Sequence, residues 1–265
     1  MRKDCREHVA VVVGGGHGIG EAVCRTMNSQ GWYVVVTDCD GDAAANVAHG
    51  LSGAHASFDM TDEPAVLQAA DSIESQYGPV RSLVVAAAVF QNIEPTEELA
   101  TSTWEHILRV NLTGTFLSNR IFGTKMLRHR HGSIVNIASI AALGSMPAEA
   151  YGTSKAGIVQ LTKNLAGEWG RAGVRVNAVS PGSTLVPRVR ERLKSGRYAG
   201  DPGHYTALGR MVQPEEVAEA VEFLASNRAS AITGVNLVVD AGWQVASTWA
   251  QFGGVRTHPE RLAEE

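Results

Sequence analysis

Three side chains able to hold or move a proton occur in one stretch, residues 133–157, which reads SIVNIASIAALGSMPAEAYGTSKAG. Tyr151 and Lys155 are four positions apart, so on a helix they share one face. Lowering the pKa of a tyrosine by ~3 units takes roughly 4 kcal/mol, and a cation ~4 Å away at an effective dielectric of ~20 supplies energy on that order. Ser139 follows an apolar, strand-like run. The stretch predicts a tyrosine general acid/base that is assisted by a lysine and a serine.

A glycine-rich turn provides a second chemical signal near the start of the chain. Residues 11–20 read VVVGGGHGIG, between an apolar run and a helical pattern. Backbone N–H groups and a positive helix end come together at such a junction, which suits a pyrophosphate. Gly14, Gly18 and Gly20 give G-x-x-x-G-x-G, which differs from the common G-x-G-x-x-G fingerprint. It is not a P-loop, because no Lys-Ser/Thr pair follows.

Asp38 ends the next apolar run, about 20 positions after the glycines. A carboxylate there accepts hydrogen bonds from an adenosine ribose and repels a 2′-phosphate. No Arg or Lys stands in the glycine turn or directly after Asp38 to bind that phosphate. The alternative is that Asp38 is a plain turn residue at a strand end. With the glycine turn beside it, we expect the cofactor to be NAD.

The elements that must position these groups alternate along the chain. Val-rich runs that are apolar on both faces predict strands covered by helices on both sides. The expected fold class is α/β, a doubly wound parallel sheet of the Rossmann type with about seven strands. The strands expected are 8–13, 32–37, 54–58, 82–87, 133–138, 174–179 and 235–239, and the helices are 19–30, 41–51, 62–77, 100–129, 151–171 and 214–226.

We expect one nucleotide-binding domain over residues 1–244 and a C-terminal extension over 245–265. Within the domain, residues 183–212 are rich in Gly and Pro and break the alternation, as a functional lid does. In the extension, Val245, Trp249, Phe252 and Val255 form a helix-like apolar stripe. We expect residues 245–257 to pack on an adjacent subunit; the alternative is that they fold back on their own subunit.

Composition excludes several other classes. The chain has 265 residues, of which 44% are hydrophobic and 19% charged, with a formal net charge of −4. This balance is globular, and it offers no basic field for nucleic acid or anionic lipid. The three cysteines lack metal-ligand spacing and fit a reducing compartment, and the charged N-terminus does not read as a signal peptide. We therefore expect a cytoplasmic protein with no metal, nucleic-acid or membrane partner.

Taken together, these motifs resemble the short-chain dehydrogenase/reductase family, over about residues 6–243. The resemblance rests on VGGGHGIG (13–20), Asp38, FDMTD (58–62), RVNLTG (109–114), Ser139, YGTSK (151–155), NAVSPGST (177–184) and ITGVNLVVDAGW (232–243). It implies that Tyr151 transfers the proton, Ser139 polarises the substrate oxygen, and Lys155 binds the nicotinamide ribose and lowers the pKa of Tyr151. Asn111 is expected to hold a water in the proton relay.

The same resemblance implies a set of cofactor contacts. Ile19 is expected to meet the pyrophosphate through its backbone, and Asp59 and Met60 the adenine. The complete set of expected cofactor-binding residues is Gly14, Gly18, Ile19, Gly20, Asp38, Asp59, Met60, Ala87, Tyr151, Lys155, Pro181, Gly182 and Thr184.

The chain departs from the family pattern at two places. Val13 stands where the family usually has Thr, and Val85-Ala86-Ala87-Ala88 replaces the usual N-N-A-G. Small apolar replacements keep the room at that position but lose side-chain hydrogen bonds. The expected consequence falls on cofactor affinity, since no catalytic group has changed.

These observations favour an NAD-dependent oxidoreductase that interconverts a secondary alcohol and a ketone, with a sugar, polyol or other small polar alcohol as substrate. It is expected to form a homo-oligomer, a tetramer or dimer. The alternatives are an NAD-binding sensor or scaffold with little catalysis, and a 3-oxoacyl-type reductase docking through Arg128, Arg130 and Arg171.

The substrate pocket is expected to lie between residues 90–95, 140–148 and 183–212. The last segment carries five cations at near-helical spacing, which either meet an anionic substrate or form the solvent face of a lid helix. They are Arg188, Arg190, Arg192, Lys194 and Arg197.

Overall fold

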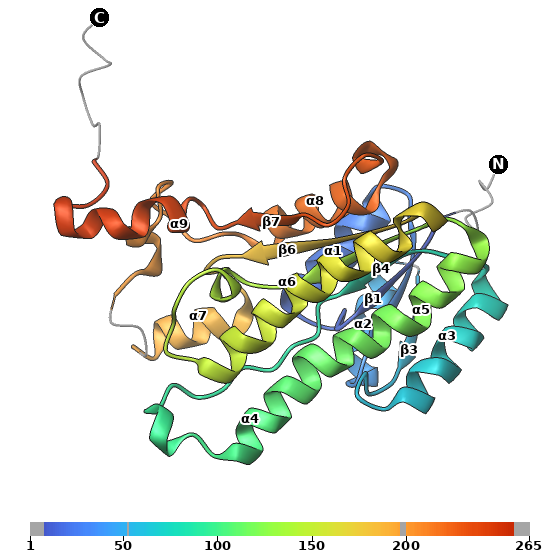
Figure 1. The fold of residues 1–265 in the computed structure, drawn as a ribbon, viewed down its shortest axis with the longest axis horizontal. Helices are drawn as coiled ribbons and strands as arrows, with labels where there is room; N and C mark the ends of the chain where they lie inside the picture. Colours follow the sequence, from blue (N-terminus) through green and yellow to red (C-terminus); the bar gives the residue numbers. More distant parts are fainter. Residues whose placement is uncertain (1–7, 52, 197–199, 257–265) are drawn as a thin grey trace, which may run out of the picture.

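The computed structural model describes residues 8–51, 53–196 and 200–256. Seven parallel strands form one sheet in the order β3-β2-β1-β4-β5-β6-β7, which confirms the expected fold class (Figure 1). The strands are β1 Val9–Val13, β2 Tyr33–Asp38, β3 Ala54–Ser57, β4 Val80–Val85, β5 Gly132–Ile137, β6 Val174–Pro181 and β7 Asn236–Val239. Cys5, Arg197 and residues 257–265 of the expected tail lie outside the described residues.

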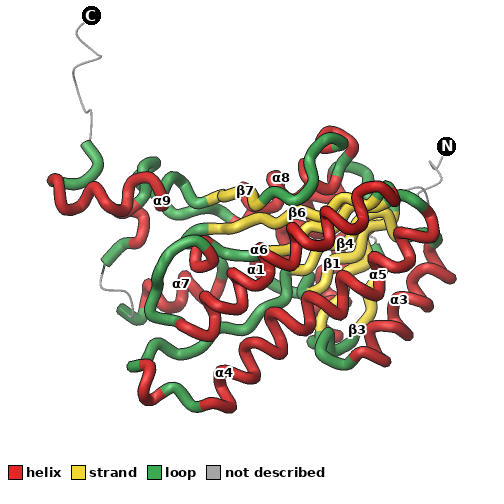
Figure 2. Tube along the Cα trace, viewed as in Figure 1, coloured by secondary structure: helices red, strands yellow, loops and turns green. Residues whose placement is uncertain are grey.

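Helices cover both faces of the sheet, as the Val-rich strands require (Figure 2). One core cluster joins α1, α2 and α8 to the sheet, and a second joins α3, α5 and α6 to the other face. All five residues of β1, VAVVV, are buried. The long helices are α1 Gly18–Ser29, α2 Gly41–Leu51, α3 Glu63–Tyr77, α4 Thr101–Leu108, α5 Thr115–His129, α6 Glu149–Trp169 and α8 Pro214–Ala225.

The single helix expected over 100–129 is interrupted. A π-helical turn, Arg109–Gly114, separates α4 from α5. Within it the Thr115 hydroxyl donates to the Asn111 carbonyl at 2.6 Å. A π turn carries one extra residue per turn and is frequent at functional sites, and it begins here just before Asn111. Helical periodicity cannot reveal such a turn, because the apolar pattern on either side continues.

The carboxyl end of β4 also differs from expectation. The strand ends at Val85 rather than Ala87. The N–H groups of Ala86 and Ala87 both donate to the Val13 carbonyl, at 2.8 and 3.0 Å. This forked bond takes the two alanines out of the ladder and holds them beside the glycine turn.

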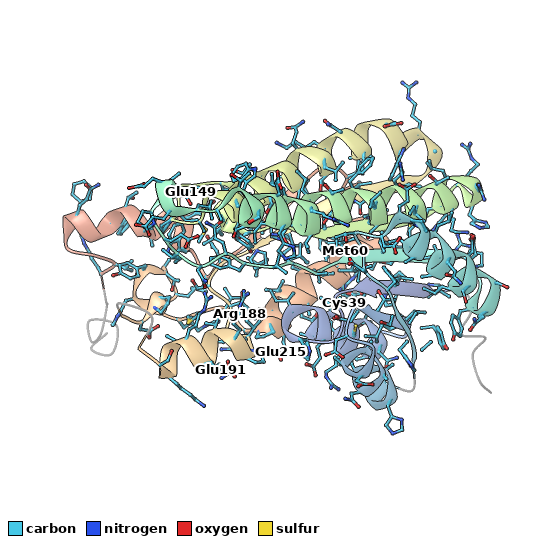
Figure 3. All side chains as sticks on the ribbon, turned by 90° about the horizontal axis from the view of Figure 1, so that it is seen from below. Cys39, Met60, Glu149, Arg188, Glu191 and Glu215 are labelled. Carbon is cyan, nitrogen blue, oxygen red and sulfur yellow. The ribbon has the colours of Figure 1, made fainter. Side chains whose placement is uncertain are left out.

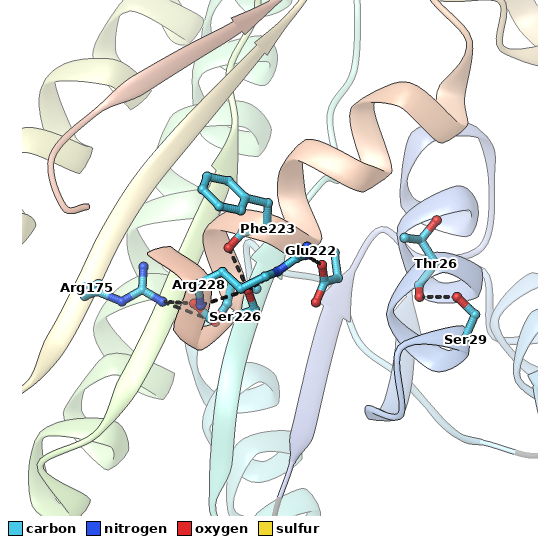
Figure 4. A network of polar contacts seen from close by, with 8 residues as sticks. Thr26, Ser29, Arg175, Glu222, Phe223, Ser226 and Arg228 are labelled. Atoms are coloured by element: carbon cyan, nitrogen blue, oxygen red, sulfur yellow. Dashed lines mark hydrogen bonds and ion pairs between the residues drawn. The ribbon is translucent and has the colours of Figure 1, made fainter. Parts of the chain in front are cut away.

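The end of α8 is fastened to β6 by one guanidinium (Figure 4). Arg175 donates to the carbonyls of Leu224, Ala225, Ser226 and Ile232 at 2.8 to 3.2 Å. These include the last carbonyls of the helix, which have no partner within it. The contact fixes the end of α8 beside the amino end of β6.

The expected lid contains a helix, α7 Pro187–Lys194, and a 3-10 turn, Pro202–Tyr205. Pro187 occupies the first turn of α7, where its missing N–H is harmless. After β7 come a short helix, α9 Trp243–Ala246, and a 3-10 helix, Ser247–Phe252. None of the helices in the described residues is both long and apolar enough to cross a membrane.

Candidate active site

The glycine turn lies between β1 and α1 and is tied to β2. The N–H groups of Gly14 and Gly15 donate to the Thr37 carbonyl at 2.8 and 2.9 Å. Gly14 has a φ of +79°, and a Cβ on it would overlap the backbone of Ala87. A Cβ on Gly20 would overlap the Gly14 carbonyl. Glycine is required at both positions so that the turn can fold this closely onto its neighbours.

The amino end of α1 is available to an anion. Its N-cap residue, His17, makes no side-chain capping hydrogen bond, and the first N–H groups of any helix lack intrahelical partners. A large cavity beside the carboxyl ends of the strands, called the main cavity below, is lined by four residues of this turn: His17, Gly18, Ile19 and Gly20. The geometry therefore fits the pyrophosphate of a dinucleotide at this helix end.

Asp38 lies at the end of β2, next to the glycine turn. Its Oδ2 accepts a hydrogen bond from the Gly16 N–H at 3.0 Å, and its Oδ1 accepts one from the Asp40 N–H at 3.1 Å. A Cβ on Gly16 would stand 2.9 Å from Asp38 Oδ2. The loop thus orients the Asp38 carboxylate through these two backbone N–H groups.

The three residues expected to act on protons come together where the carboxyl end of β5 meets the first turns of α6. Ser139 follows β5, while Tyr151 and Lys155 share one face of α6. Ser139 contacts the Tyr151 hydroxyl through a side-chain hydrogen bond. The Lys155 Nζ lies 5.6 Å from the Tyr151 ring centroid and donates to the Ile137 carbonyl at 2.8 Å. All three line the main cavity.

Burial dominates the electrostatics of this group. Burial raises the pKa of Tyr151, and a hydrogen bond from Ser139 and the positive charge of Arg188 act in the opposite direction. Burial also lowers the pKa of Lys155 to about 7. In the polypeptide alone, Lys155 is not among the groups that lower the pKa of Tyr151.

Asn111 organises the site from the π turn. Its side chain accepts from the Val89 N–H at 2.8 Å, and donates to the Val89 carbonyl at 3.0 Å and to Ser154 Oγ at 3.1 Å. Asn111 is fully buried. These bonds fasten the segment after β4 to α6 and use both amide protons of the Asn111 side chain.

The remaining expected cofactor residues are distributed along one edge of the sheet. Pro181, Gly182 and Thr184 line the main cavity after β6. Asp59 is exposed and accepts from the Thr61 N–H at 2.8 Å. The side chain of Met60 is buried in the core (labelled in Figure 3) and lies against Gly114. An adenine contact by Met60 therefore falls to its main chain.

One cavity of about 790 Å³ joins the glycine turn to Ser139, Tyr151 and Lys155. This is the size of a cofactor and ligand site. As expected, its walls include residues from the segment after β4, the segment after β5 and the lid. Sequence reasoning missed His17 and Trp243, which also line it. Trp243 follows the last strand, and nothing in its local pattern shows that the chain turns back over the cavity there.

Gln91 is a further residue that sequence reasoning placed only in the pocket wall. It is 2% exposed. Its Oε1 accepts from the Tyr151 N–H at 3.0 Å, and its Nε2 donates to Glu149 at 3.4 Å. Thr96 donates to the other Glu149 oxygen at 2.8 Å. Gln91 and Glu149 thus hold the first turn of α6, and with it the backbone that carries Tyr151.

Comparison with known proteins agrees with this geometry. A family model described as enoyl-(acyl carrier protein) reductase matches residues 14–244. The chain belongs to the short-chain dehydrogenase/reductase family. Within this family, the chain is 37% identical to D-threitol dehydrogenase of Mycolicibacterium smegmatis, over 89% of this chain and 93% of that protein. It is 36% identical to cis-4-hydroxycyclohexanecarboxylate dehydrogenase of Sinomonas cyclohexanicum, over 89% and 96% of the two chains.

A solved structure is also similar to this short-chain dehydrogenase/reductase. The crystal structure described as ribose-5-phosphate isomerase from Brucella melitensis 16M superposes with a TM-score of 0.91. The two are 45% identical, and the match covers 94% of this chain and 97% of that one. The family membership and the two dehydrogenases named above show that this protein is an oxidoreductase of the CH–OH group that uses a nicotinamide cofactor.

Proposed function

We propose that the protein is an NAD-dependent dehydrogenase that oxidises a small secondary alcohol to a ketone and catalyses the reverse reduction. The observation that carries this proposal is the shared cavity. It brings the uncapped end of α1 and the Ser139–Tyr151–Lys155 group into one space. The relatives that act on a polyol and on a hydroxylated cyclic acid, by their names, support a small alcohol as substrate.

The residues have separate roles in this reaction. Ser139 donates a hydrogen bond to the substrate oxygen, and Tyr151 accepts the hydroxyl proton during oxidation and returns it during reduction. Lys155 holds ribose hydroxyls and adds positive charge beside the phenol. When bound, the nicotinamide supplies the hydride acceptor. Asn111 keeps the wall of the site in register, and its backbone is the proposed water site.

Choice of NAD follows from charge. The Asp38 carboxylate is fixed by Gly16 and Asp40 where the adenosine ribose is expected. A 2′-phosphate there would face a like charge with no nearby cation on the glycine turn. The cofactor contacts proposed are those of the glycine turn, Asp38 and the lid start.

The arginines on which the 3-oxoacyl alternative depends lie far from the cavity mouth of their own subunit. Arg128 and Arg130 stand at the end of α5, immediately before β5 begins, and Arg171 stands immediately before β6 begins. The cavity opens at the other end of these parallel strands, where Ser139 and Pro181 lie. An acyl carrier bound to these arginines would lie at the opposite end of the strands from the cavity of the same subunit.

The test is turnover with a panel of polyols, sugars, hydroxysteroids and cyclic alcohols, with NAD and NADP in parallel. We expect NADH formation with at least one small alcohol and weaker or no NADPH formation. The Tyr151→Phe protein provides the blank. Binding of NAD without turnover of any alcohol would instead favour the sensor or scaffold alternative.

A further inference from the structure

Two arginines of the lid line the cavity beside the catalytic tyrosine. Arg188 and Arg192 are four positions apart on α7, so they share one face, and both line the cavity, whereas Arg190 and Lys194 do not. Of the two alternatives for this run, the solvent face describes Arg190 and Lys194, whereas Arg192 is half-buried and Arg188 is exposed but borders the cavity. Figure 3 shows Arg188 on α7, with Glu149 at the start of α6.

Phe90 connects these arginines to the reacting end of the site. Its ring centroid lies 4.7 Å from that of Tyr151. The guanidinium carbons of Arg188 and Arg192 stand 5.6 and 5.4 Å from the Phe90 centroid. Both guanidinium groups and the Tyr151 ring therefore contact the same Phe90 ring, so one small substrate could reach the phenol and the guanidiniums together. Stacking on an aromatic face also orients a guanidinium while leaving its N–H edge free to bind an anion.

Neither Arg188 nor Arg192 has an anionic partner among the residues that the structure describes. No Asp or Glu is found among the described residues that line the cavity. Apolar side chains make up much of the cavity wall, among them Phe90, Ile93, Met146, Pro147, Val189 and Trp243. The chain has a net charge of −4. Two guanidiniums without a carboxylate partner in the described residues nevertheless border this largely apolar cavity.

We propose that Arg188 and Arg192 bind an oxyanion on the substrate, a carboxylate or phosphate several bonds from the carbinol carbon. This inference rests on the proposed function, since it names the class of alcohol that the same cavity takes. The apolar wall contacts the carbon skeleton, Ser139 and Tyr151 meet the hydroxyl, and the two guanidiniums meet the anion. Guanidinium groups match the geometry of both oxyanions.

The test uses probes that bind but cannot react. Cyclohexanecarboxylate, cyclohexyl phosphate and the neutral cyclohexanecarboxamide are titrated into the NADH-saturated enzyme by calorimetry. We expect at least one anion to bind roughly tenfold tighter than the amide, the usual margin of a charge-assisted hydrogen bond. The preference should shrink as salt is raised. Whichever anion binds more tightly identifies the chemical source.

Matched variants assign the effect. Arg188→Gln and Arg192→Gln are each expected to reduce the anion preference severalfold, and the double variant to remove it, while affinity for the amide stays unchanged. Lys194→Gln removes the same charge from the same helix outside the cavity, and it should keep the preference. NADH affinity, measured on every variant, verifies the fold.

Three results would overturn the proposal. They are equal binding of anions and amide, an equal loss in the Lys194→Gln protein, and a parallel loss of NADH affinity that would assign the arginines to the cofactor. Failure of the proposed function is a different outcome. There, the anion preference persists although no alcohol in the panel, hydroxy acids and sugar phosphates included, is turned over.

Discussion

Lys155 is a cation held inside the protein without a carboxylate beside it. Burial lowers its pKa to about 7, from an ordinary value near 10.5. Below pH 7 the folded protein must keep the charged ammonium buried, so the full penalty on folding is present there. Between pH 7 and about 10.5 only the unfolded chain binds the proton, so the penalty falls as pH rises.

Replacing this residue should therefore stabilise the ligand-free protein. We expect Lys155→Met to raise the free energy of unfolding by about 2 kcal/mol at pH 6 and by less at pH 9, while it abolishes turnover and weakens NAD binding. Thermal unfolding at the two pH values measures the first effect. A destabilised Lys155→Met protein at pH 6 would show that the bond to the Ile137 carbonyl outweighs the burial of the charge.

Tyr151 carries the one proton that the proposed reaction must transfer. Tyr151→Phe keeps the ring against Phe90 and removes only the hydroxyl. We expect turnover to fall by roughly 10³-fold or more, on the scale of lost acid–base catalysis, with NAD affinity nearly unchanged. Steady-state kinetics and NAD titration measure these separately. Activity close to wild type would refute the mechanism.

Asp38 sets the cofactor preference through its charge. The wild type is expected to prefer NAD to NADP clearly, and Asp38→Ala should narrow the gap by removing repulsion of the 2′-phosphate. The comparison is the ratio of kcat/KM with the two cofactors at fixed alcohol concentration. The Gly16 N–H loses its acceptor too, so NAD affinity should also fall somewhat. A wild type that favours NADP would contradict this assignment.

The positions of the candidate catalytic and cofactor-binding residues in the fold were the most predictable part of the molecule. The i, i+4 pair Tyr151 and Lys155, the glycine turn and Asp38 each depend on local spacing next to one strand or helix. Gln91 and Trp243 were not predictable, since their roles come from contacts with segments far away in the chain. The raised pKa of Tyr151 was missed for a related reason: spacing gives neighbours but not the depth at which they are buried.

At the scale of elements, strand and helix positions followed from periodicity to within about two residues. The structure departs where hydrogen bonding other than the regular ladder decides. The π turn before α5 and the forked bond from Ala86 and Ala87 to Val13 are both of this kind. The helix in the lid was anticipated only as cation spacing. Which side of α7 borders the cavity, the side of Arg188 and Arg192, could not be predicted from that spacing.

Arg175 provides a test of how elements are joined. Arg175→Met removes four charge-assisted hydrogen bonds at the end of α8 and leaves carbonyls without a partner. We expect a loss of about 2–4 kcal/mol in the free energy of unfolding, measured by urea denaturation. Arg25→Gln is the control, because it removes a half-exposed arginine whose only ion-pair partner among the described residues, Glu21, is also on the surface of α1. Equal effects in the two variants would show that the carbonyl contacts are not special.

At the scale of the whole molecule, the described part of the C-terminal segment exposes several apolar side chains. Val245, Trp249 and Phe252 are 70%, 49% and 82% exposed, so the described part of the tail does not bury its apolar stripe on its own subunit. Clustered exposed apolar side chains mark interaction sites. This favours the expected packing on an adjacent subunit.

Truncation after Gln244 tests that packing and keeps Trp243 in the cavity wall. We expect the truncated protein to show a lower oligomeric mass or a lower substrate affinity, with unchanged NAD affinity. Light scattering and kinetics provide the two measurements. An unchanged oligomeric mass, melting temperature and KM would show that the tail is dispensable.

The sheet order has a consequence for how the chain is made. β1 is synthesised first and pairs with β2 on one side and β4 on the other, so its second edge stays open until Val80–Val85 has emerged. VAVVV is an apolar, β-branched run, and such an edge invites pairing with other chains. Long-range parallel pairing is also slow to form. Polar substitutions in β1 or β4 that slow their pairing should therefore lower the yield of folded protein during translation. Chaperones that shield β1 until β4 has emerged should restore that yield.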